Sequence, residues 1–285
     1  KWYPALITFG AGHQLAEMRW LRDPAIPWGH LAALIANQRA DGAFIGARTD
    51  EAGNEYTDFV GFGALDLYLA TLDRARFASA APALGRAVEH AIARDCDGDF
   101  LPGPKDHWES GMEWQPSFFA FDGYDARKET PLERVEAACF LHGNAIAAAR
   151  AAELAGGSGA RYREVAARVG EAIESGLWDP GARFYVARRE SDHAMATDRE
   201  VPGFYPPAFG ITASDRLGYL AAVADPERWA ARFPVPSVEM ASPAFAFDKK
   251  WPLGPGGSPS MWNGPTWPHA ESVVLRSLAV GERAG

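Results

Sequence analysis

The chain has 285 residues, of which 47% are hydrophobic, and its formal net charge is −9. This acidic balance, with no local cluster of lysine and arginine, argues against a nucleic-acid partner. No apolar run approaches the roughly 20 residues that a membrane-spanning helix needs, so we expect no membrane partner either. The composition predicts a globular protein, and because no linker divides the sequence we expect a single domain over residues 1–285.

The cysteines indicate the cellular compartment, and the spacing of possible ligands limits the cofactors and metal ions that the chain could bind. Cys96 and Cys139 form neither a CxxC motif nor a disulfide framework, which is typical of a reducing compartment. Since no signal peptide is visible, the predicted location is cytoplasmic. No glycine-rich loop follows a predicted strand, and no pair of histidines has the spacing of metal ligands. We therefore expect neither a cofactor nor a metal ion.

Helical periodicity of apolar residues dominates the first part of the chain. An early helical stretch ends at Arg19. A second helix is predicted over residues 59–72, with Asp58 either as its N-cap residue or as a hydroxyl ligand. An apolar stripe at i+4 spacing marks a third helix at residues 84–92.

A longer helix is predicted over residues 131–155. Thr130 would be its N-cap residue, Pro131 would occupy the first helical position, and Glu133 would complete a capping box. A further apolar stripe at i+4 spacing predicts a helix over residues 165–177.

The last third of the sequence is more irregular. A short strand is predicted over residues 183–187, and a helix start is predicted at residues 225–227. The stretches 186–213 and 234–268 indicate long loops, and loops of this length in a compact domain usually carry function. An apolar helical segment follows at residues 273–280.

Three tight turns indicate how the helices are connected. The turns at residues 41–44, 97–100 and 179–184 each follow a helical segment and end on an aromatic residue that returns to the core. This recurrence predicts an all-α array of helical hairpins.

Two short loops carry the residues best suited to chemistry. Residues 107–117, HWESGMEWQPS, combine two acids, two indoles, an amide and a hydroxyl, with a glycine and a proline that rule out an unbroken helix. Indole rings stack on the apolar face of a pyranose, and they exclude water, which raises the pKa of a nearby carboxyl group. The loop is typical of acid catalysis on a sugar, although a surface loop with two solvated acids remains an alternative.

The second loop has the same chemistry. Residues 261–271, MWNGPTWPHAE, again place two indoles, an amide, a histidine and an acid on a backbone stiffened by glycine and proline. One such loop would fit a structural role. Two on one chain predict two walls of one carbohydrate pocket.

These loops resemble a known group of enzymes. Residues 108–113, WESGME, resemble the W-E-S-G-M-D segment of inverting α-glycosidases with an (α/α)6 barrel, and residues 262–267, WNGPTW, resemble their W-N/R-G-P-x-W segment. The families are glycoside hydrolase family 63, in its mannosylglycerate-hydrolase-like branch, and more distantly the family 37 trehalases. The resemblance implies an (α/α)6 toroid, the six-hairpin glycosidase fold, and hydrolysis of an α-glucoside or α-mannoside with inversion.

The sequence departs from the family pattern in two places. The residue after Gly-Met is normally an aspartate that acts as general acid, and here it is Glu113, one methylene longer. The family's catalytic base is a glutamate some tens of residues beyond the second segment, and the sequence reaches Gly285 before such a position. We therefore expect a barrel that is incomplete at its C-terminal end.

The resemblance also implies roles for individual residues. Glu113 would protonate the leaving oxygen, Glu109 would orient the loop or bind a hydroxyl, and Glu271 would be a further carboxylate in the pocket. Tryptophans would form the pocket walls, while amides and a histidine would bind hydroxyls: Trp108, Trp114, Trp262, Trp267, Gln115, Asn263 and His269. Arg19 or Asp23 would bind hydroxyls as well, or this segment is instead a helix C-terminus whose basic residues complement the helix dipole.

Two other functions fit the same residues. A sugar epimerase or lyase on the same scaffold would need a histidine or lysine base, and His107 and His269 keep this alternative open. A non-catalytic carbohydrate-binding protein would fit the exchange of aspartate for Glu113 and the missing base. In each case the partner is a small carbohydrate or glycoside.

Overall fold

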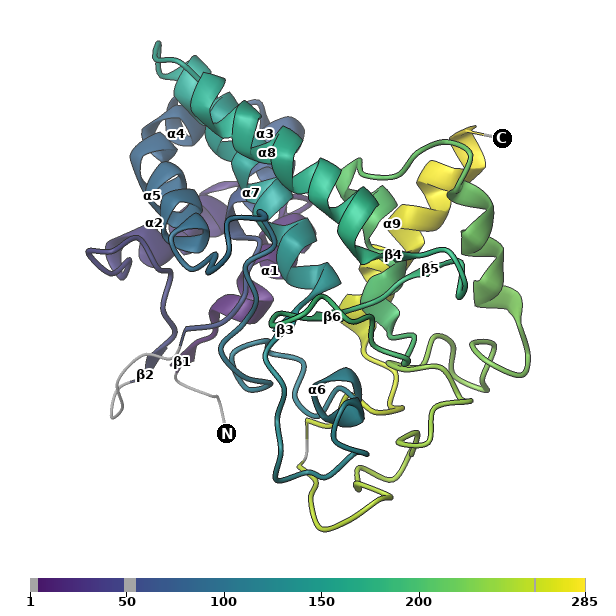
Figure 1. Cartoon of the computed structure of the whole chain (residues 1–285). Coiled ribbons are helices and arrows are strands. Elements are labelled where there is room, and N and C mark those ends of the chain that lie inside the picture. The colour runs from purple at the N-terminus through teal and green to yellow at the C-terminus, as the bar shows by residue number, and fades with distance from the viewer. Residues whose placement is uncertain (1–4, 49–54, 259, 285) are drawn as a thin grey trace. The chain divides into compact units, whose positions relative to one another are not determined.

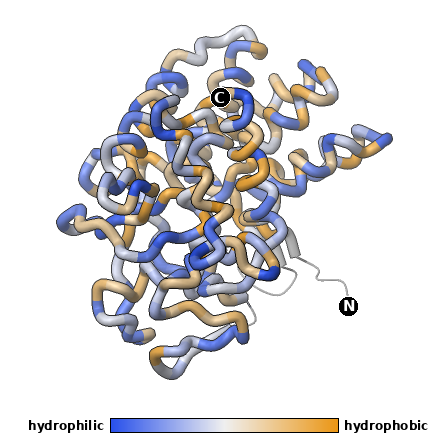
Figure 2. The backbone as a smooth tube through the Cα atoms, turned by 90° about the vertical axis from the view of Figure 1, so that its right-hand side faces the viewer, coloured by the Kyte–Doolittle hydropathy of each residue, from blue (hydrophilic) through white to orange (hydrophobic). Residues whose placement is uncertain are grey.

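A computed structural model describes residues 5–48, 55–258 and 260–284. The chain folds into two compact units, one formed by Lys1–Pro102 and Phe140–Gly170, the other by Gly103–Cys139 and Glu171–Gly285. Each unit has its own buried apolar residues. Along the backbone, hydrophobic and hydrophilic residues alternate within the helices, as Figure 2 shows.

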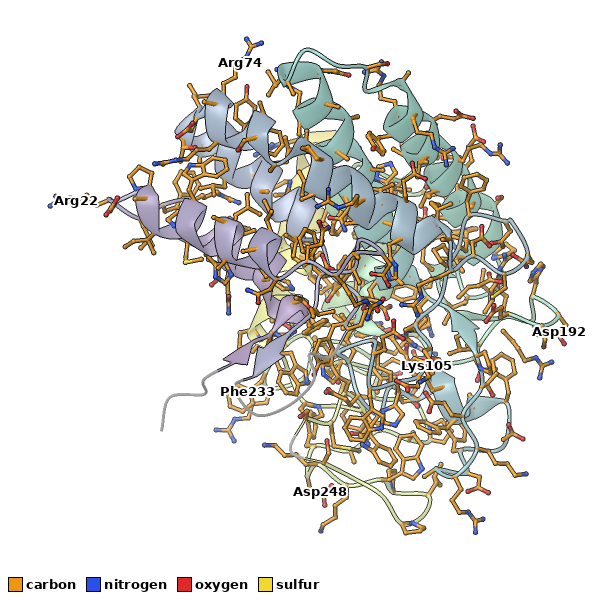
Figure 3. The ribbon with its side chains drawn as sticks, turned by 90° about the vertical axis from the view of Figure 1, so that its left-hand side faces the viewer. Arg22, Arg74, Lys105, Asp192, Phe233 and Asp248 are labelled. Atoms are coloured by element: carbon orange, nitrogen blue, oxygen red, sulfur yellow. The ribbon has the colours of Figure 1, made fainter. Side chains whose placement is uncertain are left out.

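The first unit is built mainly from α-helices (Figure 1). They are α1 (Thr8–Met18), α2 (Ala25–Ala36), α3 (Val60–Thr71), α4 (Arg74–Ser79), α5 (Ala81–Ile92) and most of α7 (Val135–Leu154) and α8 (Ala160–Ala172). One ribbon pairs β1 (Ala5–Leu6) with β2 (Ala47–Arg48) in antiparallel fashion. Arg22 and Arg74 extend from this unit into solvent (Figure 3).

The predicted helices of this unit are confirmed, and the apolar stripes of α5 and α8 face the core. Leu84 and Val88 of α5 are buried, as are Val165 and Val169 of α8. The carboxylate of Asp58 accepts a hydrogen bond of 2.8 Å from the backbone amide of Val60. The N-cap residue of α3 is Phe59, so the predicted N-cap role of Asp58 is wrong by one position.

Helices α1 and α3 approach closely because glycines line their contact. A Cβ atom on Gly63 would lie 2.5 Å from the carbonyl oxygen of Gly12 and 2.9 Å from its Cα atom. A Cβ atom on Gly12 would lie 2.6 Å from the ring of Phe59. Any side chain at Gly63 must therefore push the two helices apart.

The second unit contains few long helices and much irregular backbone. Its elements are α6 (Ser117–Ala120), the start of α7, the π-helical turn η1 (Ile173–Leu177), the 3-10 helices η2 (Val201–Phe204), η3 (Pro206–Phe209) and η4 (Leu217–Ala224), and α9 (Pro268–Ala284). Two antiparallel ribbons pair β3 (Leu132–Glu133) with β6 (Arg188–Arg189) and β4 (Trp178–Asp179) with β5 (Phe184–Tyr185). Within the described ranges every sheet has two strands, in agreement with the all-α prediction.

The predictions for this unit were partly right. The apolar segment at residues 273–280 lies in α9, and the predicted strand at residues 183–187 contains β5. The helix start predicted at residues 225–227 is wrong. The carbonyl of Asp225 accepts the amide of Trp229 at 2.8 Å, but this closes a single turn that does not continue as a helix.

The predicted capping box at Thr130 is also wrong. Helix α7 begins at Val135, and Glu133 lies in β3, where its carboxylate pairs with Arg188 of β6. The amide of Thr130 donates to the carbonyl of Phe118 at 2.8 Å. The local capping signal was overridden because a buried ion pair and a strand pairing take Glu133 and its neighbour out of the helix. None of the helices described is long and apolar enough to cross a membrane.

Candidate active site

The acid loop, defined here as residues 107–117, lies in the second unit as a series of tight turns. The hydroxyl of Ser110 donates to the carbonyl of His107 at 2.7 Å and accepts from the amide of Met112 at 3.0 Å. Gly111 has a positive φ of 70°, which favours glycine at this position. The loop therefore has a defined backbone path that leads to Glu113.

The acid loop contacts the tryptophan loop, defined here as residues 261–271. The backbone amide of Trp262 donates to the carbonyl of Glu113 at 2.9 Å. Met261 is fully buried in the same apolar cluster as Phe118 and Phe119, which follow the acid loop. The two loops singled out in the sequence are thus adjacent within one unit.

Glu113 is half-buried at this junction. Burial raises the pKa of its carboxyl group above the ordinary value, because the low-dielectric surroundings disfavour the charged form. A carboxyl group in this state retains its proton to a higher pH, which suits proton donation.

His107 organises the turn that carries Glu113. Its Nδ1 accepts a hydrogen bond of 3.3 Å from the amide of Trp114, whose φ of 66° lies in the left-handed region. Burial lowers the pKa of His107 to about 4, so the ring is neutral near pH 7 and, with Nδ1 accepting, carries its proton on Nε2.

The two tryptophans of the acid loop differ in exposure. Trp108 is 51% exposed and rests against His107 with 4.6 Å between ring centroids. Trp114 packs against Phe119 and Trp251, with centroids 5.6 and 5.7 Å apart. Trp108 therefore offers an open indole face, whereas Trp114 supports the loop from inside.

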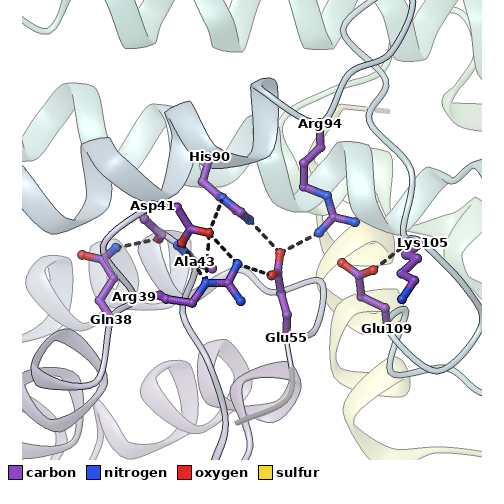
Figure 4. Close-up of polar contacts among 10 residues, drawn as sticks. Gln38, Arg39, Asp41, Ala43, Glu55, His90, Arg94, Lys105 and Glu109 are labelled. Atoms are coloured by element: carbon purple, nitrogen blue, oxygen red, sulfur yellow. Dashed lines mark hydrogen bonds and ion pairs between the residues drawn. The ribbon is translucent and has the colours of Figure 1, made fainter. Parts of the chain in front are cut away.

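The remaining acid-loop residues make local contacts. Oε2 of Glu109 accepts the amide of Lys105 at 2.8 Å, a contact drawn at the right of Figure 4. Gln115 is fully buried, and its carbonyl oxygen accepts from Arg134. The structure thus places Glu109 where it braces the loop, and Gln115 in a buried polar cluster.

The tryptophan loop is more buried than its predicted role as a pocket wall suggests. Trp262 is 1% exposed and stacks on Trp267 with 4.8 Å between centroids and 7° between planes. Nε1 of Trp267 donates to the carbonyl of Met261 at 3.0 Å. Trp262 is therefore part of the interior, and Trp267 covers it as a half-buried ring.

Asn263 has a structural role in this loop. Its Nδ2 donates to the carbonyls of Ala244 and Lys250, both at 2.9 Å. The side chain is fully buried, and its Oδ1 has no hydrogen-bond partner among the described residues. The amide nitrogen of Asn263 thus links two loop segments, whereas its amide oxygen makes no hydrogen bond to the described residues.

His269 and Glu271 stand at the start of α9. His269 meets Trp262 edge to face at 5.1 Å, and burial lowers its pKa to about 4. Oε1 of Glu271 accepts the amide of Val235 at 2.5 Å, and burial raises the pKa of its carboxyl group.

Arg19 and Asp23 belong to the first unit, where their partners are local. Arg19 follows α1 and forms an ion pair of 3.1 Å with Asp66, while its guanidinium lies 4.9 Å from the ring of Trp20. Oδ1 of Asp23 accepts the amide of Ala25, the first residue of α2, at 2.9 Å. Their binding of hydroxyls stays a prediction.

A buried charged cluster that the sequence did not predict contacts the acid loop. Arg134 and Glu136 are 1% and 0% exposed and pair with each other, and Arg134 also pairs with Glu200 at 3.0 Å. Burial raises the pKa of Glu200 to about 7, although Arg134 opposes this shift. The alternation of charges at residues 133–136 beside apolar neighbours was the available signal, and it was interpreted as helix capping instead.

The model of the mannosylglycerate hydrolase MGH1-like glycoside hydrolase domain matches residues 3–283. No curated protein matches the sequence. An uncharacterized conserved protein from Thermus thermophilus is similar in structure, with a TM-score of 0.80, 20% identity and coverage of 99% of this chain and 83% of its own.

Two characterised enzymes have similar structures. The GH63 mannosylglycerate hydrolase from Thermus thermophilus, in complex with glucose, has a TM-score of 0.79 and 20% identity, with coverage of 99% of this chain and 84% of that chain. The neutral trehalase Nth1 from Saccharomyces cerevisiae has a TM-score of 0.64 and 14% identity, with coverage of 98% and 62%. At these identities the likeness establishes the fold, and it confirms the predicted (α/α)6-type architecture. Together with the family match over nearly the whole sequence, it shows that the chain belongs to the mannosylglycerate hydrolase MGH1-like glycoside hydrolase domain family.

Proposed function

We propose that this glycoside hydrolase cleaves an α-mannoside or α-glucoside and that Glu113 is its general acid. Membership of the family confirms the predicted enzyme class and supports inversion, and it does not favour the epimerase, lyase or non-catalytic alternatives. The assignment of Glu113 rests on the match of residues 108–113 to the family's acid segment and on the position of Glu113 at the junction of the two loops.

The observation that carries this assignment is the anchoring of the Glu113 backbone. Its carbonyl is held by Trp262, the amide before it by the hydroxyl of Ser110, and the amide after it by His107. A general acid must meet the glycosidic oxygen at hydrogen-bond distance, and a fixed backbone with a half-buried carboxyl group whose pKa is raised by burial suits this requirement.

In the proposed reaction Glu113 donates its proton to the leaving oxygen as the glycosidic bond breaks. A second carboxylate, roughly 6.5–9.5 Å away in enzymes of this type, would deprotonate a water molecule that attacks from the opposite face. Departure of the aglycone as an alcohol then leaves the sugar with inverted anomeric configuration.

The exposure of each tryptophan decides whether we propose that it stacks on the sugar or supports the pocket. We propose Trp108 as the main stacking surface, because its indole is exposed on the same loop as Glu113. Trp114, Trp262 and Trp267 would support the pocket from behind. Glu271 and His269 remain proposed hydroxyl ligands at the start of α9.

The proposed substrate is a hexose in α-linkage to a small polar aglycone. The similar enzyme from Thermus thermophilus is a mannosylglycerate hydrolase whose complex contains glucose, which supports both sugar classes as starting points. A cytoplasmic location, where such a small glycoside would be met, stays a prediction.

Proton NMR of the products tests the function. With an α-mannoside or α-glucoside, inversion predicts that the β-anomer appears first and then equilibrates. Glu113→Gln should lower kcat by roughly 10²–10⁴-fold, because the amide keeps its shape but has no proton to donate. First appearance of the α-anomer, or full activity of Glu113→Gln, would contradict the mechanism.

A further inference from the structure

Arg134 is almost fully enclosed, at 1% exposed, at the position just before α7. A buried arginine is costly unless its donors are satisfied. Here Nη1 donates to the hydroxyl of Ser117 at 2.6 Å, Nη2 donates to the carbonyl oxygen of Gln115, and the guanidinium lies 4.6 Å from the ring centroid of Phe118. Three residues at and just after the C-terminal end of the acid loop thus meet one side chain.

Glu200 and Glu136 also accept hydrogen bonds from this guanidinium. Nε of Arg134 donates to Glu136, and Nη2 also donates to Glu200 at 3.0 Å. Glu200 in turn accepts the amide of Ser117 at 2.9 Å and its hydroxyl at 3.0 Å. The acid loop is therefore bonded to both Arg134 and Glu200, so the position of the loop and the position of this ion pair depend on each other.

This cluster is the second of two anchors around Glu113. The first consists of Ser110, His107 and Trp262, which bond to the backbone at residues 112–114. The second begins at Gln115, two residues after Glu113. Because only Trp114 separates Glu113 from the second anchor, movement at that anchor would shift the backbone at Glu113 and alter the direction of its carboxyl group.

We propose that Arg134 is a positioning residue that orients the acid loop so that Glu113 reaches the glycosidic oxygen. This inference rests on the proposed role of Glu113. The planar fork of the guanidinium bonds to Gln115 and Ser117 at once, which a lysine ammonium on a flexible stem does not reproduce. Arg134 itself touches no reacting atom.

Hydrogen exchange of the whole protein tests the anchoring without any need for activity. Arg134→Lys should lose amide protection in peptides that cover residues 107–117, with α8 and α9 unchanged. Arg188→Lys is the matched control, since Arg188 is also a buried arginine of the same unit and pairs with Glu133. Unchanged protection of residues 107–117 in Arg134→Lys, or equal loss in Arg188→Lys, would overturn the inference.

Kinetics then separate positioning from a merely structural role. Substrates with an alkyl and with a 2,4-dinitrophenyl aglycone are compared, because the second needs little protonation. Arg134→Lys should lower kcat on the alkyl glycoside by roughly a hundredfold, the size expected for a misplaced catalytic group, with a much smaller loss on the dinitrophenyl glycoside and little change in KM. A loss of folded enzyme would lower both rates equally and would contradict positioning.

Two further variants keep the outcomes distinct. If Arg134→Lys does not fold, Ser117→Ala removes the two hydroxyl bonds of the same anchor, from Arg134 and to Glu200, with little change in packing, and it should show the same leaving-group dependence to a smaller extent. Glu113→Gln reports on the proposed function itself. Leaving-group dependence in Glu113→Gln but in neither anchor variant would refute only the role of Arg134, whereas its absence in Glu113→Gln would refute the acid assignment.

Discussion

Shortening Glu113 to aspartate, the residue that the family motif carries, should impair this enzyme. The substitution withdraws the carboxyl group by about 1.5 Å, the length of one carbon–carbon bond. The backbone has little freedom to advance, because three successive residues are bonded: the amide of Met112 at 3.0 Å, the carbonyl of Glu113 at 2.9 Å and the amide of Trp114 at 3.3 Å.

A displacement of about 1 Å from reacting geometry costs on the order of 10²-fold in rate. We therefore expect Glu113→Asp to lower kcat on an alkyl α-glycoside by about 10²-fold, or about 2.7 kcal/mol in activation free energy. The loss should be small on the 2,4-dinitrophenyl glycoside, since departure of that aglycone needs little protonation.

The assay is initial-rate kinetics on both substrates, with Glu109→Asp as control. Glu109 lies on the same loop and braces the amide of Lys105, so shortening it should lower both rates by a similar factor. Wild-type activity of Glu113→Asp on the alkyl glycoside would show that the acid loop moves to compensate, and the anchoring argument would then be wrong.

Further predictions concern stability, pH and binding. Gly63→Ala should destabilise by about 1–3 kcal/mol in urea unfolding, because its Cβ would lie 2.5 Å from the Gly12 carbonyl, whereas Gly29→Ala in α2, with no atom within 4 Å, should be neutral or stabilising. Burial raises the pKa of Asp58 to about 7, so its contribution to stability is present below the ordinary carboxyl pKa and is lost as pH rises through about 7. Asp58→Asn should flatten that decline in melts between pH 5 and pH 8, and an identical decline would exclude Asp58 as its cause. Trp108→Ala should raise KM for the glycoside more than it lowers kcat, and an unchanged KM would remove its stacking role.

The two loops can be recognised in the sequence because the residues that mark them are close together along the chain. Residues 107–117 and 261–271 each combine acids, amides and indoles on stiff backbone, and their similarity predicted that they lie together. The hydrogen bond between Trp262 and Glu113 agrees with that prediction. Exposure was not predictable in the same way, because an indole looks alike in sequence whether it faces a sugar, as proposed for Trp108, or the interior, as Trp262 does.

By itself the sequence determined the helical class and most helix positions. The periods of α5, α8 and α9 are visible because a helix repeats every 3.6 residues and one face must be buried. The tertiary structure alone decided the start of α7 and the support of the acid loop. Arg134 meets Glu200 across 66 positions in sequence, and a pairing of that kind leaves no periodic trace in either segment. Local patterns record which face of an element is buried, whereas the partner of a buried charge is chosen only when distant segments pack together.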